Sequence, residues 1–582
     1  MGLMRMVRPR REQNSMKRLM AIVTVLGLAV VVPARASQPP KPRLVVLVII
    51  DQFRGDYLAR WAPYFSKDGL GRLIHKGAWF DNAYYTYGAL ATGPGHASLS
   101  TGATPSVHGI VGNDWYAQPG RTEIYCCADP NVHGVGYPDG KNHAGRSPAN
   151  MRSDSLGDLI KSATAGRGQV WGVALKDRAA ILSTGTHADG AIWWDSSSGR
   201  LVSSTYYGDR LPDAIDKLNG EHFVDRFFKT RWTLLQSADV YHPGSIAGRS
   251  DPAAYGRTHT GRFPKIIGAE SDHPDRRYYR ELYITPMANE LVFEAAKRLV
   301  ATRSLGSDGD VDLLVVGLSA NDVVGHRYGP ESAEVMDCTL RTDRQLAAFF
   351  TWLDQRVGLD NCLVGLSSDH GVGPIVEYSE ALGLGGGRFD SRGLVKKIDK
   401  ALNRRFGAPA HRQSYVVDLL LPWLYLDEQA ISASGGTVDE AARIAADVAA
   451  EYEGVAETFT KAQIVAPGFA VADTLRGDVA HSYYPKRSGQ VYIHWRRYWY
   501  KQSKLAGHGA AYDYDKHVPV VLMGPGVRPG RYGRRVRPTD LTVTICKLLG
   551  IESAASMTGR VLSDAIADPV ATAQPGNTGA GK

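Results

Sequence analysis

Cysteine is scarce in this chain, and its spacing excludes two kinds of stabilising site. The 582 residues include five cysteines, an odd number, and none forms a C-x2-C pair. Cys126 and Cys127 are adjacent and poorly placed to bridge each other, while Cys338 and Cys362 are predicted to be separated by a long helix. Cys546 falls on an apolar helix face, where a thiol packs as a small hydrophobic group. The sequence therefore predicts neither a disulfide framework nor a cysteine zinc site.

Long apolar runs are missing as well. The longest candidate, Leu19 to Val32, has 14 residues, whereas a membrane span needs about 20. It follows the basic start Met16-Lys17-Arg18 and precedes the small-residue site Ala34-Arg35-Ala36, which is the order found in secretory signal peptides. We predict a signal peptide over residues 1–36, cleaved after Ala36, rather than a transmembrane anchor. Residues 1–15 are either an extended basic region or the product of an upstream start.

Charge of one sign, repeats and low-complexity tracts are also lacking. The formal net charge of +9 is concentrated in residues 1–36, which hold seven basic residues and one acid. The remaining chain has 61 basic and 58 acidic residues, a net charge of +3, with no basic block. These observations argue against a nucleic-acid-binding surface.

What is present is an alternation of apolar, strand-length runs with helical patterns. This alternation predicts an α/β fold with a mostly parallel central sheet and helices on both faces. The expected strands span 44–50, 169–175, 311–318, 362–367 and 519–523, and the expected helices span 69–76, 177–184, 331–354 and 539–549.

Two stretches interrupt that rhythm. Residues 195–285 are rich in Gly, Asp, Tyr and His with weak periodicity, and residues 375–500 carry a helix at 438–452 and an aromatic strand-like segment at 490–500. We interpret both as insertions that cover the site within one catalytic domain, residues 37–567. Residues 568–582 are expected to form a disordered tail.

Acidic and histidine side chains follow several of the predicted strands. In an open α/β sheet, chemistry is placed at the carboxyl ends of the strands. Asp and His supply the oxygen and nitrogen ligands that Zn²⁺ accepts, and six ligands suit two metals about 4 Å apart rather than one. The six candidates are Asp51, Asp322, His326, Asp369, His370 and His508. Asp322 and His326 are expected to project toward one point from a turn after a strand. Each candidate alone is more often a cap or a surface group, and Asp369-His370-Gly371 by itself favours a polar strand-to-loop turn.

A hydroxyl nucleophile is offered by the stretch Thr92-Gly-Pro-Gly-His-Ala-Ser98. Thr92 is expected just before a helix whose free N–H groups and dipole favour a phosphate. The competing interpretation is that Thr92 only caps the helix. Ser98 and Thr101 are alternative hydroxyls, but they fall inside or after the helix and would point away from the anion site.

These motifs resemble the alkaline phosphatase superfamily, and within it the periplasmic, phosphate-irrepressible alkaline phosphatases that use a threonine nucleophile. The motifs occur in the family's order from residue 44 to residue 550: Asp51–Tyr57, Thr92–Ser98, Gly112–Trp115, Lys176–Arg178, Asp322–His326, Asp369-His370 and the stretch His508–Pro519. Individually they are weak, whereas seven in order are a specific signal.

The resemblance implies a residue set and a reaction. One zinc would be bound by Asp322, His326 and His508, and the other by Asp51, Asp369 and His370, with the oxygen of Thr92 also on the second metal. Asn113, Lys176 and Arg178 would hold the non-bridging phosphate oxygens. His517 matches a family position that is not a ligand.

The expected function is hydrolysis of small phosphate monoesters by a secreted or periplasmic enzyme, with two Zn²⁺ per chain and a phosphothreonine intermediate. No nucleic-acid partner is expected, nor a membrane partner after signal cleavage, and a monomer is compatible with the sequence. The main alternative is a nucleotide pyrophosphatase/phosphodiesterase of the same superfamily, in which the Lys176/Arg178 pair is typically absent. A sulfatase is disfavoured because Thr92-Gly-Pro-Gly-His lacks the C/S-x-P-x-R motif, and a non-catalytic scaffold is disfavoured because no ligand is missing.

Overall fold

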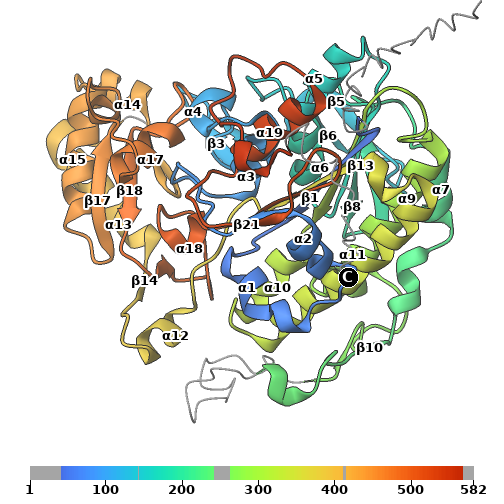
Figure 1. The fold of residues 1–582 in the computed structure, drawn as a ribbon. Coiled ribbons are helices and arrows are strands. Elements are labelled where there is room, and N and C mark those ends of the chain that lie inside the picture. Colours follow the sequence, from blue (N-terminus) through green and yellow to red (C-terminus); the bar gives the residue numbers. More distant parts are fainter. Residues whose placement is uncertain (1–40, 142, 242–262, 410–413, 568–582) are drawn as a thin grey trace, which may run out of the picture.

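A computed structural model describes residues 41–141, 143–241, 263–409 and 414–567 (Figure 1). The predicted signal peptide and the predicted tail from residue 568 lie outside the described residues. The centre of the molecule is an 11-stranded sheet with the strand order β21-β2-β20-β13-β1-β12-β7-β8-β9-β5-β6.

The middle of this sheet is parallel, as the alternating pattern predicted. The five parallel strands are β13 (Cys362–Ser367), β1 (Leu44–Ile50), β12 (Asp312–Leu318), β7 (Val170–Ala174) and β8 (Gly190–Asp195). The flanks are mixed, because β20 (Val520–Met523) pairs antiparallel with β13, and β9 (Arg200–Ser204) pairs antiparallel with β8. The other flanking strands are β2 (Ala78–Phe80), β21 (Gly530–Tyr532), β5 (Ala128–Val135) and β6 (Ala144–Arg146), of which β21 and β6 form the two edges.

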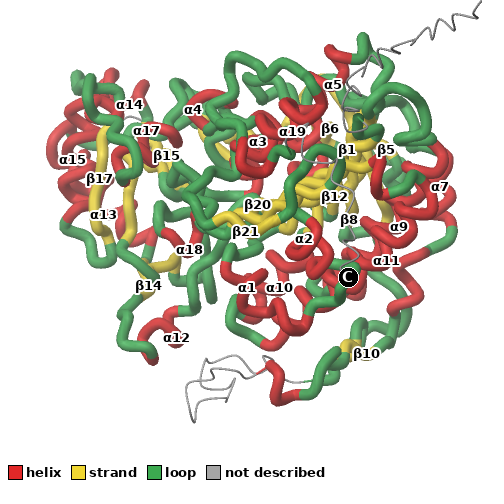
Figure 2. Tube along the Cα trace, viewed as in Figure 1, coloured by secondary structure: helices red, strands yellow, loops and turns green. Residues whose placement is uncertain are grey.

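Helices cover both faces of the sheet (Figure 2). Leu44, Val46, Val48 and Ile50 of β1 pack in a cluster with α1 (Asp56–Trp61), α2 (Leu70–Lys76), α9 (Ala288–Arg303) and α11 (Ala333–Arg356). The alternate residues Val45, Leu47 and Ile49 pack with α3 (Thr92–Thr101), α5 (Leu156–Ala163) and α19 (Asp540–Leu549). Because both faces are buried, the strand is apolar throughout instead of alternating with polar residues.

The segment predicted as the second insertion carries a sheet of its own, seen in orange beside the main sheet in Figure 1. Its strand order is β15-β16-β18-β17, with all neighbours antiparallel. The strands are β15 (Val416–Leu420), β16 (Trp423–Leu426), β18 (Val491–Trp495) and β17 (Val455–Thr460), and they pack on α13 (Ser391–Phe406) and α15 (Val438–Ala450). The predicted strand at 490–500 is two strands, because the chain turns between β18 and β19 (Trp499–Lys501), with Tyr498 at φ +62°.

The remaining elements are short or lie in connections. They are α4 (Pro105–His108), β3 (Asp114–Tyr116), β4 (Glu123–Tyr125), α6 (Asp177–Thr184), α7 (Asp213–Gly220), β10 (Arg231–Trp232), β11 (Lys265–Ile266), α8 (Arg276–Tyr283), α10 (Ala320–Tyr328), α12 (Val376–Ala381), β14 (Gly387–Phe389), α14 (Glu428–Ala433), α16 (Lys461–Ile464), α17 (Leu475–Ser482) and α18 (Asp513–Lys516). The start of the predicted first insertion, residues 195–204, belongs to the main sheet through β8 and β9.

All five cysteines fall within the described residues, where each is buried and unpaired. No helix among the described residues is long and apolar enough to span a membrane.

Candidate active site

The predicted site residues gather at the carboxyl edge of the parallel strands. Asp51 directly follows β1, whereas Lys176 lies two residues after the end of β7 and Asp369 two residues after the end of β13. Asp322 lies in α10, which begins two residues after β12. Parallel strands end on the same side of a sheet, so residues far apart in sequence meet there.

One tight group consists of Asp51, Asp369 and His370, and all three side chains are fully buried. His370 Nε2 lies 3.6 Å from Asp51 Oδ1 and 3.4 Å from Asp369 Oδ2. The other ring nitrogen, Nδ1, is 2.9 Å from the carbonyl oxygen of Gly371, which fixes the orientation of the imidazole. This group coincides with one of the two ligand sets expected from the sequence.

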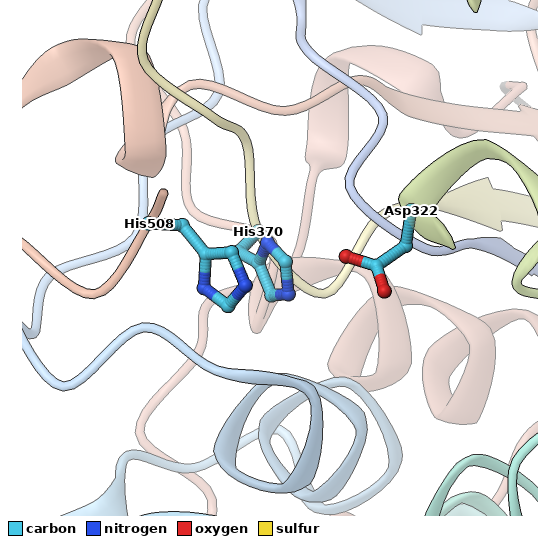
Figure 3. A group of neighbouring side chains, drawn as sticks. All are labelled: Asp322, His370 and His508. Atoms are coloured by element: carbon cyan, nitrogen blue, oxygen red, sulfur yellow. The ribbon is translucent and has the colours of Figure 1, made fainter. Parts of the chain in front are cut away.

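A second group combines Asp322, His370 and His508 (Figure 3). The rings of His370 and His508 stack at 3.6 Å, and the carboxylate of Asp322 points toward them. His508 Nδ1 lies 2.9 Å from the carbonyl oxygen of Leu90. His370 therefore borders both groups.

His326 reaches this group by a different route from the one expected. The sequence suggested that Asp322 and His326 project from a turn, but both lie in helix α10, four residues apart on one face. His326 Nε2 is 3.2 Å from Asp322 Oδ1, and its ring centre is 5.2 Å from that of His508. The helical spacing of i and i+4 places the two side chains over each other.

Several potential metal-ligand atoms in and beside these two groups lack a partner among the residues that the structure describes. Within the described part of the chain, Asp51 Oδ1, Asp369 Oδ2, His370 Nε2 and His326 Nδ1 are buried without a hydrogen-bond partner. Buried polar atoms in native proteins rarely lack a hydrogen-bond partner. A cluster of buried atoms without partners is therefore typical of a site that binds a metal or another group. Carboxylates and imidazoles are ligands that suit zinc and related divalent ions.

Lys176 neutralises part of this acidic cluster. Its Nζ lies 2.6 Å from Asp51 Oδ2 and 2.6 Å from Asp322 Oδ2. Burial alone would lower the pKa of the Lys176 ammonium, but Asp322 and Asp51 raise it above its usual value. Burial opposes ionisation of Asp322, yet Lys176 and His326 hold the pKa of that carboxyl well below its ordinary range.

The carboxyl of Asp369 behaves differently. Burial and the neighbouring charge of Asp51 raise the pKa of Asp369 well above its usual value. Asp51 itself is buried, but Lys176, His370 and His96 lower its pKa. A cluster of carboxylates with pKa values pushed apart is typical of a functional site.

The hydroxyl of Thr92 faces two cations. Thr92 Oγ1 lies 3.4 Å from Lys176 Nζ and 3.5 Å from Arg178 Nη2. Thr92 is the first residue of helix α3, not the residue before it as predicted, and Ala91 occupies the N-cap position. The structure therefore does not support the interpretation that Thr92 only caps the helix.

The competing hydroxyls are engaged elsewhere. Ser98 Oγ is 2.9 Å from His108 Nε2, and Thr101 Oγ1 donates to the carbonyl oxygen of Ala97 at 2.7 Å. Asn113, which directly precedes β3, reaches the start of α3 with its side chain, and its Oδ1 accepts a hydrogen bond of 2.8 Å from the N–H of Gly93. Thr92 is thus the hydroxyl placed beside both the acidic cluster and the cations.

Two neighbours of the ligand groups were not singled out from the sequence. Gln52, in a left-handed conformation at φ +61°, donates from Nε2 to Asp322 Oδ1 at 2.7 Å and from its backbone N–H to Asp369 Oδ1 at 3.0 Å. His96 Nε2 lies 3.7 Å from Asp369 Oδ2, and burial lowers the pKa of His96 to about 3. Gln52 directly follows Asp51, and His96 lies inside the motif Thr92–Ser98. These two positions are the sequence signals that could have identified them.

Arg178 is also held by residues that the sequence did not indicate. Its Nη1 is 3.5 Å from Tyr125 Oη, which in turn donates to Asp177 Oδ1 at 2.5 Å. Arg146 Nε donates to the other oxygen of Asp177 at 3.0 Å. This chain of contacts fixes the guanidinium, and no spacing pattern in the sequence could reveal it.

A cavity of about 500 Å³ opens over the site. The polar and charged residues Thr92, Asn113, Lys176, Arg178 and Asp322 line it, together with the aromatic residues Phe389, Trp495, Trp499 and Tyr500. The volume lies within the range of about 300–1,000 Å³ found for small-molecule sites. A hydroxyl, two cations and candidate metal ligands in one enclosed space define the kind of site that metal-dependent phosphoryl-transfer enzymes use.

Comparisons with known proteins agree with this class. The sequence profile of the family "Type I phosphodiesterase / nucleotide pyrophosphatase" matches residues 45–385. The chain therefore belongs to this family, within the alkaline phosphatase superfamily that the motifs resemble.

Three relatives extend the similarity over almost the whole chain. They are a calcium-transporting ATPase of Myroides odoratus (32% identical, 90% of this chain and 95% of the relative), the alkaline phosphatase PhoV of Synechococcus elongatus (30%, 90% and 93%) and the alkaline phosphatase PafA of Elizabethkingia meningoseptica (30%, 94% and 99%). The crystal structure of alkaline phosphatase PafA has a TM-score of 0.81 with 29% identity, covering 91% of this chain and 99% of that one. A second structure of PafA carries substitutions at one threonine, one asparagine, one lysine and one arginine.

Proposed function

We propose that this protein is a secreted alkaline phosphatase that hydrolyses small phosphate monoesters with two zinc ions and a covalent phosphothreonine at Thr92. The observation that carries the proposal is the position of Thr92 Oγ1, 3.4 Å from Lys176 Nζ and 3.5 Å from Arg178 Nη2, beside two groups of candidate metal ligands. A hydroxyl between fixed positive charges suits attack on a phosphate dianion.

The metal ligands would be divided as the family resemblance implies. Asp51, Asp369 and His370 would hold one zinc, and Asp322, His326 and His508 the other, with His370 close to both. When bound, the zinc ions would supply positive charge that favours the ionised hydroxyl and stabilises the leaving oxygen. The buried donor atoms without partners support this assignment.

The protein's own residues would orient the substrate and bear its charge. Lys176, Arg178 and Asn113 line the cavity around Thr92 and would bind the non-bridging oxygens of the phosphate. The dipole of α3, whose N-terminus lies at Thr92, would add to this positive charge. Thr92 Oγ would attack phosphorus while the ester oxygen departs, and water would then cleave the phosphothreonine to release inorganic phosphate.

Monoesters are favoured over diesters for an electrostatic reason. A monoester presents two negative charges to Lys176 and Arg178, whereas a diester presents one. The names of the relatives support this choice, since two are alkaline phosphatases, and an ATPase also transfers a phosphoryl group to water. The four residue types substituted in the PafA variant occur here in the same order at Thr92, Asn113, Lys176 and Arg178.

The decisive experiment compares a monoester with a diester. Lys176→Ala and Arg178→Ala should each lower kcat/KM for an aryl phosphate by about 30- to 1,000-fold, as expected for loss of about 2–4 kcal/mol of transition-state stabilisation. The loss for an aryl phosphodiester should be much smaller, and the zinc content should not change. Equal losses on both substrates would contradict the proposal and favour the phosphodiesterase alternative.

Matched controls are available among residues that do not line the cavity. Lys161 pairs with Asp189 and Arg167 pairs with Asp310, both away from the cavity. Lys161→Ala and Arg167→Ala should leave both substrates unaffected.

The domain and compartment assignments belong to the same proposal. Residues 1–36 would direct export and be removed, and residues 37–567 would form the catalytic unit, with segments 195–285 and 375–500 as insertions. The second segment supports this role, because Phe389, Trp495 and Trp499 line the same cavity as Thr92. Detection of the cleaved protein outside the cytoplasm, with Ser37 at its N-terminus, would test the assignment.

A further inference from the structure

A second groove adjoins the active-site cavity. It has a volume of about 890 Å³, which is within the range of small-molecule sites, and residues of α8, α10 and β11 line it. Ile284 borders the groove, whereas its neighbour Tyr283 borders the active-site cavity. In the same way Arg327 borders the groove and His326 the cavity. Consecutive residues of two segments thus face the two spaces, so the groove lies directly beside the active site.

Tyr283 stands at the boundary between the groove and the cavity. The charges of Lys176 and Arg178 act on its hydroxyl, which places that hydroxyl near the cations around Thr92. Tyr283 is also the last residue of α8. The helix therefore leads from the groove toward the proposed phosphate-binding residues.

The groove carries more positive than negative charge. Its lining includes five basic and three acidic residues, which are Lys265, Arg276, Arg277, Arg280 and Arg327, and Glu270, Asp275 and Glu281. The acidic side chains are engaged within the protein. Glu270 pairs with Arg277, and Asp275 and Glu281 accept hydrogen bonds from backbone N–H groups at 2.8 Å and 2.6 Å.

Arg276 and Arg280 of α8 have no comparable partner. Both are exposed, and in the part of the chain that the structure describes neither forms an ion pair or a side-chain hydrogen bond. Arg276, Arg280 and Tyr283 follow one another at spacings of four and three residues, which places them on one face of the helix. At 1.5 Å per residue, Arg280 lies about 4.5 Å and Arg276 about 10.5 Å from Tyr283 along the helix axis. The two guanidinium groups therefore form a row of positive charge that leads away from the active-site cavity.

We propose that this row is a second anion subsite, which binds a phosphate carried by the leaving group of the substrate. The proposal rests on the proposed phosphomonoesterase function. It assigns Arg276 and Arg280 as specificity-determining residues for phosphate esters whose alcohol bears a second phosphate. With the ester that is cleaved at Thr92, the second phosphate lies along α8, where a planar guanidinium can hold two of its oxygens. Positive charge beside a cleft also raises the local concentration of such polyanionic substrates.

The test uses two substrates that differ only in the second phosphate. Hexyl phosphate and hexane-1,6-diyl bisphosphate both release a primary alkyl alcohol, so the intrinsic reactivity of the ester is matched. The zinc-loaded wild type should prefer the bisphosphate by about 5- to 25-fold in kcat/KM per ester group, since each exposed ion pair with an arginine is worth up to about fivefold.

Substitutions on α8 locate the subsite. Arg276→Ala and Arg280→Ala should each lower the ratio of the two kcat/KM values about 2- to 5-fold, and the double variant should lose most of the preference. Arg404→Ala is the matched control, because Arg404 is an exposed arginine of helix α13 that lines neither the groove nor the cavity. This control should leave the ratio unchanged.

Inhibition gives a readout that does not depend on cleavage of the bisphosphate. Hexane-1,6-diyl bisphosphonate, whose carbon–phosphorus bonds are not hydrolysed, should inhibit hydrolysis of an aryl phosphate more strongly than hexylphosphonate. The difference between the two inhibition constants should shrink in the double variant. Equal inhibition of the wild type by the two phosphonates would overturn the subsite.

The kinetic outcomes separate the two proposals. If the wild type hydrolyses both esters with equal kcat/KM per ester group, the subsite is overturned while the phosphatase function stands. The subsite is also overturned if the double variant keeps the wild-type preference, because the second phosphate then binds elsewhere, as at the exposed Lys501 and Lys504 of the active-site cavity. If neither ester nor an aryl phosphate is hydrolysed, the proposed function fails and the subsite fails with it.

Discussion

We expect the substitution Gly95→Ala, which adds one carbon, to move the proposed nucleophile Thr92 away from Asp369 and the neighbouring acidic residues. Gly95 lies in the first turn of α3, three residues after Thr92, and packs directly on the backbone of Asp369. A Cβ at this position would lie 2.3 Å from the carbonyl oxygen of Asp369 and 2.6 Å from its Cβ. Heavy atoms in contact prefer about 3.5–4.0 Å, so Gly95→Ala requires a shift of roughly 1 Å.

No flexible side chain can absorb this shift. The three atoms nearest to the added carbon are the backbone carbonyl oxygen, the carbonyl carbon and the Cβ of Asp369, and Asp369 is fully buried. Helix α3 must therefore move away from the Asp369–His370 segment, and Thr92 moves with it. A misplacement of about 1 Å can cost about 100-fold in rate, and overpacking costs about 1–3 kcal/mol of stability.

The assay is steady-state hydrolysis of an aryl phosphate, with zinc content and thermal unfolding measured on the same preparation. Gly95→Ala should lose about 100-fold in kcat/KM while remaining folded. The matched control is Gly220→Ala at the end of α7, where an added Cβ meets nothing within 4 Å. Activity of Gly95→Ala within threefold of wild type would refute the reasoning.

Three further predictions concern the nucleophile, the metals and Arg178. Thr92→Ser should retain substantial activity and Thr92→Ala should lose several orders of magnitude, with a phosphothreonine trapped at low pH in the wild type; near wild-type turnover by Thr92→Ala would exclude the covalent mechanism. Chelation should abolish activity, zinc should restore it, and elemental analysis should find two zinc ions per active chain, so a single ion would contradict the bimetal assignment. Tyr125→Phe removes the hydroxyl 3.5 Å from Arg178 Nη1 and should lower kcat/KM for a monoester by about 2- to 13-fold, the equivalent of one hydrogen bond, with no change in zinc content. An unchanged kcat/KM in Tyr125→Phe would show that the Tyr125 hydroxyl does not position the guanidinium of Arg178.

The central strands could be predicted because their apolar runs are long and bounded. Residues 44–50, 312–318 and 362–367 are buried on both faces, which leaves an unmistakable run of apolar side chains. Strand direction could not be obtained in the same way. The run at 519–523 resembles the others, yet β20 lies antiparallel to β13, because direction depends on the connection and not on the composition of the strand.

The helix that carries Asp322 and His326 was missed for a local reason. Two valines and a glycine separate these residues, and all three have weak helix propensity. Packing of α10 against α11 overrides that preference, and Val324 and Gly325 are buried. A spacing of four residues is also compatible with a turn, so only the fold distinguishes the two.

The sequence by itself determined the residue types at the site, their order along the chain and their place after the strands, because apolar runs, glycines and ionisable groups leave local patterns. Only the tertiary structure decided how those groups meet. The bridge from Lys176 to Asp51 and Asp322, the place of His370 beside both ligand groups and the contact of Gln52 with Asp322 join residues that are far apart in sequence. These contacts depend on sheet register and helix packing. Both are set by the whole core, so they cannot be predicted from any single segment of the sequence.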